Sequence, residues 1–362
     1  MLIDIFLGLV MGVSSAFLFI HPNNFLSQVQ SQEMIVSLSI TFLFFSIIPS
    51  LYFFAGEETG GILNAIQRLV KKGKGVIAVN SYSQGVLLAI LFFPILAFVY
   101  FSFLQEIYFS FKSLIFFILI IYLLSYSTLS IRHFFLVILF SVFGLMTYKF
   151  DVLLPMLSGF YTVPYLLGKT SKIPYQKKAR SKLTFQSKAY LVSLSVFVSS
   201  FFSFLPGVTS TAAVFTTKFF ARLKSEELIF FNGATNSFFL INSFIALYLL
   251  NSIKSGAALA LTSFKSNLFY IYGIVLITAF LCFLLINYFS INVLNLFSKI
   301  PALFLKVFTL TFLISVCIFL LGPYSLIILF TSSSLSFLAT SMKVSKGICS
   351  CSLIAPAAVL IF

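Results

Sequence analysis

Apolar runs of about 17–25 residues, separated by short polar turns, follow one another along most of the chain. A helix needs roughly 20 apolar residues to cross a bilayer, whereas a membrane barrel shows alternating segments of about ten. The pattern therefore predicts an all-α, polytopic membrane bundle with roughly nine to eleven transmembrane segments. The expected apolar segments are 2–20, 35–54, 76–103, 114–129, 134–147, 152–167, 189–205, 228–250, 268–286, 307–321, 322–340 and 353–362.

Two of these segments carry a further expectation. The segment 152–167 contains Pro155, Gly159 and Pro164, so it is either a short span or a broken hairpin. The first segment is expected to remain as a transmembrane helix, because its start carries Asp4 where a signal peptide carries basic residues.

The clearest polar interruption is the segment 169–188, which is rich in lysine and contains no acidic residue. Basic loops stay on the cytoplasmic side of a membrane. The segment is therefore expected to be a cytoplasmic linker between an N-terminal membrane half, 1–168, and a C-terminal membrane half, 189–362. The same rule places the basic turn 68–74 on the side of the linker.

A polar break opens the second half. Pro206 removes a backbone donor and Gly207 tolerates non-helical dihedrals, so a helix is expected to break here. At membrane depth such a break survives only where protein or a water-filled cavity satisfies the backbone, which makes it a candidate solute or ion site. The alternatives are a surface loop and simple N-capping of the next helix. The hydroxyl residues concerned are Thr209, Ser210 and Thr211.

The first half repeats this order of parts in weaker form. An apolar span leads to His21, Pro22 and Asn23, and a polar segment with a basic turn follows at 56–75, which can be set loosely against 234–256. His21 and Asn23 are candidate ligands of an anion or proton, with a helix-end histidine as the alternative. Carboxylates within a membrane are usually functional, but a solvated first helical turn is equally consistent with the pattern. The candidates for coupling-ion ligands are Glu57, Glu58 and Thr59.

Amides mark the span that begins near 228. Asn232, Thr235 and Asn236 are spaced i, i+3 and i+4, so they share one face of a helix. They are candidate contacts for a solute or ion, and the alternative is interhelical hydrogen bonding that holds the bundle together.

Composition narrows the function classes. The chain is 60% hydrophobic and 9% charged, so its net charge of +15 is attributed to cytoplasmic loops and not to nucleic-acid binding. Cys282 and Cys317 lie in apolar runs, and Cys349 and Cys351 are too close together for a zinc site. No Ser/His/Asp set and no nucleotide-binding loop is visible. We therefore expect no enzyme, no metal site and no cofactor other than a coupling Na⁺ or H⁺.

In the order of these parts the chain resembles the large permease subunit of tripartite tricarboxylate transporters (the TctA-like family), and most closely its archaeal-type branch. The family's Pro-Gly before His-Pro-Asn is replaced here by Leu18 and Phe19. The likeness covers nearly the whole chain and is carried by 20–23; by 49–50, 56–59 and 72–75; by 159–174; by 205–208, 232–236 and 255–258; and by the tail 338–362.

The resemblance implies a multi-pass protein of the cytoplasmic membrane that moves a small organic anion, such as a carboxylate. In the tripartite systems the large subunit works with a small membrane subunit and a solute-binding protein, which makes both candidate partners. The expected mechanism is ion-coupled alternating access around two broken segments. A membrane enzyme or lipid-handling protein acting on a lipid-linked substrate is the alternative, and a non-transporting assembly role is a third.

Overall fold

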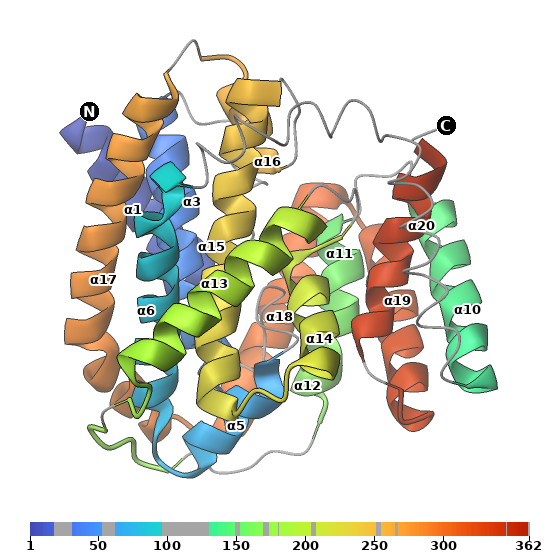
Figure 1. The fold of residues 1–362 in the computed structure, drawn as a ribbon. Coiled ribbons are helices and arrows are strands. Elements are labelled where there is room, and N and C mark those ends of the chain that lie inside the picture. The colour runs from blue at the N-terminus through green and yellow to red at the C-terminus, as the bar shows by residue number, and fades with distance from the viewer. Residues whose placement is uncertain are drawn as a thin grey trace.

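The computed structural model describes residues 1–17, 31–52, 62–95, 130–148, 153–168, 174–179, 181–203, 208–250, 255–264, 267–344 and 346–360. Every regular element in these ranges is helical (Figure 1). The expected segment 114–129 lies outside them. The helices before the linker are α1 (Leu2–Phe17), α3 (Gln32–Phe45), α4 (Ile47–Tyr52), α5 (Leu63–Lys71), α6 (Gly75–Leu91), α10 (Ile131–Thr147), α11 (Leu153–Leu157), η3 (Ser158–Thr162) and α12 (Val163–Leu166).

After the linker the helices are longer. They are α13 (Phe185–Phe202), α14 (Ser210–Phe220), α15 (Ser225–Leu250), α16 (Gly256–Leu261), α17 (Leu268–Lys299), α18 (Ala302–Leu321), α19 (Ser325–Ser341), η4 (Lys346–Ser350) and α20 (Cys351–Leu360).

Three of the described helices are long and apolar enough to cross a membrane, over Ser225–Tyr248, Leu268–Lys299 and Ala302–Phe319. α15 is buried almost all round, whereas α17 and α18 present large apolar side chains outward, including Phe280 and Phe319. An outward apolar surface of this kind is what lipid contact requires. These three helices suggest a membrane protein.

The helices pack into two groups. The larger hydrophobic cluster draws on α1, α3–α6, α13 and α15–α17. The second group contains α10–α12, α18, α19, η4 and α20. α14 joins them, because Ala212 packs in the second group while Ala213 and Val214 pack in the first. Each group therefore contains helices from both sides of the linker.

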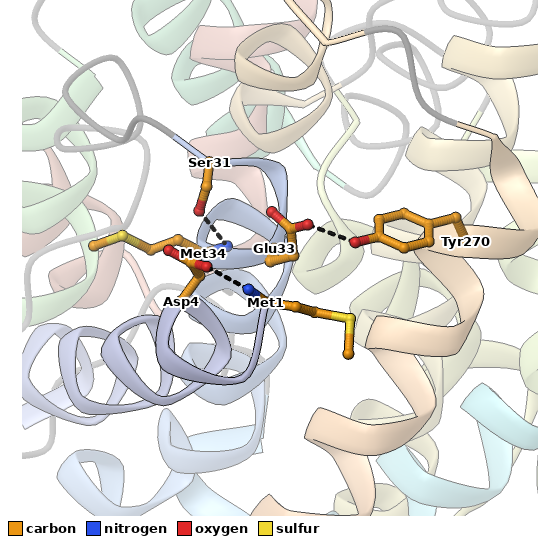
Figure 2. Close-up of polar contacts among 6 residues, drawn as sticks. All are labelled: Met1, Asp4, Ser31, Glu33, Met34 and Tyr270. Carbon is orange, nitrogen blue, oxygen red and sulfur yellow. Dashed lines mark hydrogen bonds and ion pairs between the residues drawn. The ribbon is translucent and has the colours of Figure 1, made fainter.

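Helix directions in the larger group follow from its contacts. Met1 and Asp4 at the start of α1 lie beside the start of α3, and Tyr270 at the start of α17 donates a hydrogen bond to Glu33 (Figure 2). Farther along, Thr41 of α3 meets Cys282 of α17. The helices α1, α3 and α17 therefore begin at the same end and run in the same direction.

The helices α6, α13 and α15 begin at the opposite end (Figure 1). There the Glu226 carboxylate accepts hydrogen bonds from Ser81 Oγ at 3.2 Å and from the backbone N–H of Lys182 at 3.1 Å. The linker lies at this end too, because the Lys177 N–H donates to Gly73 O at 2.9 Å. The expectation that the basic turn and the linker share one side is confirmed.

Two neighbouring expected boundaries, the end at 286 and the start at 307, are wrong. The segment expected to end at 286 continues as α17 to Lys299, and α18 already begins at Ala302. The polar residues Asn287, Ser290 and Asn295 lowered the apolar signal. They nevertheless continue the helix, because Ser290 is buried and the two asparagines are half-buried, whereas Tyr288, Phe289 and Leu296 face outward.

Between 153 and 166 the chain forms one continuous helical segment with a π-helical turn at Ser158–Thr162, so the hairpin alternative is wrong. Pro164 lacks the N–H that would bond the Phe160 carbonyl. Ser336 Oγ of α19 donates to that carbonyl at 2.6 Å instead. Gly159 permits the close approach, because a Cβ there would lie 2.7 Å from Leu329 O.

Candidate functional site

A buried polar network crosses the middle of the larger group. Asn232, Thr235 and Asn236 of α15 are 0%, 0% and 4% exposed. Asn236 Nδ2 donates to Tyr82 Oη of α6 at 3.2 Å, and Tyr82 Oη lies 3.2 Å from Ser46 Oγ, next to the end of α3. Side chains from three helices thus converge, where a solute could be bound by hydroxyl and amide groups.

Two glycines bring α6 and α15 together. A Cβ on Gly85 would lie 2.2 Å from Phe230 O, and one on Gly233 would lie 2.4 Å from Tyr82 O. No side chain fits at such distances, so the two backbones touch directly. This close crossing places the Tyr82 ring across α15 and its hydroxyl against Asn236.

Thr235 carries the most informative atom of the network. Its Oγ1 is buried and has no hydrogen-bond partner among the described residues. In a helix a threonine hydroxyl usually bonds the carbonyl one turn earlier, and leaving it unpaired costs about 1–3 kcal/mol. A buried polar atom of this kind is expected where a water, ion or ligand supplies the missing bond.

The polar break after 205 leads into α14. Thr209 is the N-cap, since its side chain accepts from the Ala212 N–H at 3.3 Å. The capping interpretation of Thr209 is confirmed, and it does not exclude a ligand role. Ser210 is half-buried in the first turn, and Thr211 is 3% exposed. The hydroxyl residues therefore begin α14. Residues 204–207 before them lie outside the described ranges, so the choice between a surface loop and a buried break stays open.

Several predicted site residues lie outside the described ranges, so their positions stay predictions. They are His21, Asn23, Glu57, Glu58, Thr59, Pro206 and Gly207. Within the described ranges no group of three or more His, Cys, Asp or Glu side chains is placed to hold a metal ion.

The sequence did not single out Tyr82 or Ser46. Tyrosine and serine are common in this chain, and neither has a spacing that links α6 to α3. A possible signal was the run of polar residues Asn80, Ser81, Ser83 and Gln84 inside an apolar helix. It marked the helix that contributes to the network, but not the tyrosine that makes the bonds.

Replacing Tyr82 with phenylalanine is expected to destabilise the protein by about 1 kcal/mol, because the hydroxyl that joins Asn236 to Ser46 is lost. The same substitution at Tyr288, whose side chain is 74% exposed on α17, serves as the control. Thermal unfolding of the two purified variants in detergent measures the difference. Equal melting temperatures would contradict a structural role for the Tyr82 hydroxyl.

Comparison of the chain with protein-family models, with curated proteins and with solved structures finds no match.

Proposed function

We propose that the chain is a permease-like secondary transporter subunit of the cytoplasmic membrane that moves a small organic anion, such as a carboxylate, by ion-coupled alternating access. The buried hydrogen bond between Tyr82 and Asn236 and the buried Thr235 hydroxyl, one residue away on α15, carry this proposal. Soluble protein cores and membrane bundles alike avoid unpaired buried hydroxyls. A network that retains one at the centre of an apolar bundle is suited to bind a polar solute.

An inverted repeat in the larger group supports alternating access. The repeat relates α1, α3, α5 and α6 to α13, α15, α16 and α17. In the first set α3 packs against α1, and in the second α15 packs against α13. Between the sets α3 contacts α17 and α16, and α15 contacts α6 and α5. In this repeat α1, α3 and α6 run opposite to α13, α15 and α17, respectively (Figure 1). Each of the two matching helices α3 and α15 also carries a glutamate in its first turn, Glu33 and Glu226.

The sequence positions agree with this pairing. The starts of α3 and α15 are as far apart as those of α6 and α17, because 225 − 32 and 268 − 75 are equal. The N-caps of α5 and α16, Ile62 and Ser255, are separated by the same interval. This register pairs α5 with α16 and differs from the loose alignment of 56–75 with 234–256.

The short length of α14 supports the hypothesis that the polar break before it interrupts a membrane span. The helix has 11 residues, about 16 Å, roughly half the thickness of a hydrocarbon core, and lies in the lower half of Figure 1. Its N-terminus, with Thr209 as cap, therefore falls near the middle of the bundle, and helix N-termini attract carboxylates. The resemblance to the TctA-like family adds the substrate class and the two candidate partners, a small membrane subunit and a solute-binding protein.

Uptake of radiolabelled di- and tricarboxylates into proteoliposomes, with and without a Na⁺ or H⁺ gradient, tests the proposal. Wild-type protein is expected to accumulate at least one of them. Thr235→Val is isosteric and removes a hydroxyl without a described partner, so it should fold as well as wild type. If the hydroxyl binds the solute, uptake falls about tenfold, the equivalent of one hydrogen bond.

Thr278→Val is the matched control. Thr278 of α17 is also fully buried, with an Oγ1 that has no partner among the described residues, but the proposal gives it no solute contact. Its uptake should equal that of wild type. The proposal fails if no carboxylate moves, or if the two valine variants transport equally well.

A further inference from the structure

A cleft of about 430 Å³ lies away from the Tyr82 network, where α6, the C-terminal part of α17 and the linker meet. Clefts of roughly 300–1,000 Å³ are the size that small molecules occupy. Its polar lining residues come from all three segments, and they are Asn80, Lys178, Asn287 and Ser290.

The linker is anchored beside this cleft by Gln176, which is completely buried. Gln176 Oε1 accepts from the Gly75 N–H at 2.7 Å, and its Nε2 donates to Val70 O at 3.2 Å. Its backbone N–H donates to Asn295 Oδ1 at 3.0 Å. These bonds attach the linker to both α17 and the turn before α6. Lys178, two residues on, is therefore held at the cleft by a fixed backbone.

The lining has the chemistry of an anion site. Lys178 supplies a cation, none of the lining residues is acidic, and the surrounding turn and linker add further lysines, among them Lys72 and Lys74. A cleft lined by charge of one sign raises the local concentration of the opposite ion. The Ser290 hydroxyl already donates to Asn287 O, but the Asn287 amide uses one N–H for Phe283 O and keeps a second, so a carboxylate or phosphate group can be both paired and hydrogen-bonded.

Asn80 lines the cleft from α6, but its Oδ1 is buried and is therefore not open to a ligand there. We propose that this cleft binds a small oxyanion, with Lys178 pairing the anionic group and Asn287 donating a hydrogen bond to it.

Titration of the full chain in nanodiscs of phosphatidylcholine tests this site with malate, a hydroxycarboxylate. All four cysteines are buried, so a thiol-reactive fluorophore reports thermal unfolding. Malate is expected to raise the melting temperature, because a ligand stabilises the state that binds it. Lys178→Gln should weaken the apparent affinity about tenfold, since it removes a charge-assisted bond. Added salt should weaken wild-type binding as well.

Lys177→Gln is the matched control, because Lys177 is equally exposed and adjacent but does not line the cleft. Its affinity for malate should equal that of wild type. Equal effects of the two lysine variants, or no Lys178-dependent shift with either malate or the anionic lipid described next, would overturn the proposal.

A second titration, which is the lipid arm of the experiment beside the malate arm, distinguishes a soluble from a lipid source of the oxyanion. Phosphatidylglycerol, whose headgroup carries both a phosphate and hydroxyls, is added to the nanodiscs in place of malate. A shift that depends on Lys178 in either arm supports the site, and the responding arm identifies a soluble or a lipid ligand.

The site does not depend on the proposed transport activity, because the readout is binding. Malate binding that is lost in Thr235→Val and retained in Lys178→Gln would place the ligand at the Tyr82 network and overturn the assignment to this cleft.

Discussion

Gly85→Ala is expected to destabilise the protein by about 3 kcal/mol, a large effect for the addition of a single methyl group. The added Cβ would lie 2.2 Å from Phe230 O, 3.1 Å from Ala234 N and 3.2 Å from Phe230 C. All three atoms belong to the backbone of α15, which cannot rotate away as a side chain can. The α6–α15 crossing must therefore separate, which removes Tyr82 Oη from Asn236 and also weakens solute uptake.

Thermal unfolding in detergent measures the stability change, with Gly273→Ala on α17 as its control. A Cβ at Gly273 meets no atom within 4 Å, so alanine there removes only the flexibility of glycine. That substitution should be neutral or stabilise by up to about 1 kcal/mol. Equal melting temperatures for the two alanine variants would show that α6 and α15 are not in backbone contact.

Gln176→Ala has the second-largest expected effect, and it is local. The substitution removes the acceptor of the buried Gly75 N–H and the donor to Val70 O. Two lost bonds of about 1 kcal/mol each lower the free energy of local opening by about 2 kcal/mol, which increases the open population roughly 30-fold. Detachment of the linker should follow without global unfolding, because the hydrophobic clusters are untouched.

Hydrogen–deuterium exchange followed by mass spectrometry measures this opening. The backbone N–H groups of Gln176 and Lys177, bonded to Asn295 Oδ1 and Gly73 O, should exchange roughly 30-fold faster in the variant. Tyr175→Ala changes an exposed side chain, 65% accessible, in the same segment and should leave exchange unchanged. Unchanged protection in Gln176→Ala would mean that the linker is held by other contacts.

Hydropathy predicted the position of a helix well wherever the helix is surrounded by lipid or by apolar neighbours. Many of the expected apolar segments correspond to described helices, because a long apolar run in a membrane has few alternatives to a helix. Hydropathy predicted helix ends poorly where those ends pack against protein. The expected end at 286 was wrong because Asn287 and Ser290 are polar, yet they face the linker cleft and not lipid.

For the candidate site, spacing alone placed Asn232, Thr235 and Asn236 on one helix face, since i, i+3 and i+4 positions share a face whatever the neighbours are. Their burial is a finding of the structure. The sequence also identified the end of a polar break at Thr209, where capping was confirmed. Spacing did not identify Tyr82. Its contact with α15 forms only because Gly85 and Gly233 let the two helix backbones approach each other.

By itself, the sequence determined that the chain is helical, with apolar helices that could cross a membrane and a basic linker on the side of its basic turn, because length, hydropathy and charge act locally. Only the tertiary structure decided which helices meet. Three contacts join residues far apart in the chain. They are the close crossing at Gly85 and Gly233, the hydrogen bond from Ser336 to the Phe160 carbonyl, and the bonds of buried Gln176. Such contacts depend on close packing and on the pairing of buried polar groups, and a hydropathy profile predicts neither.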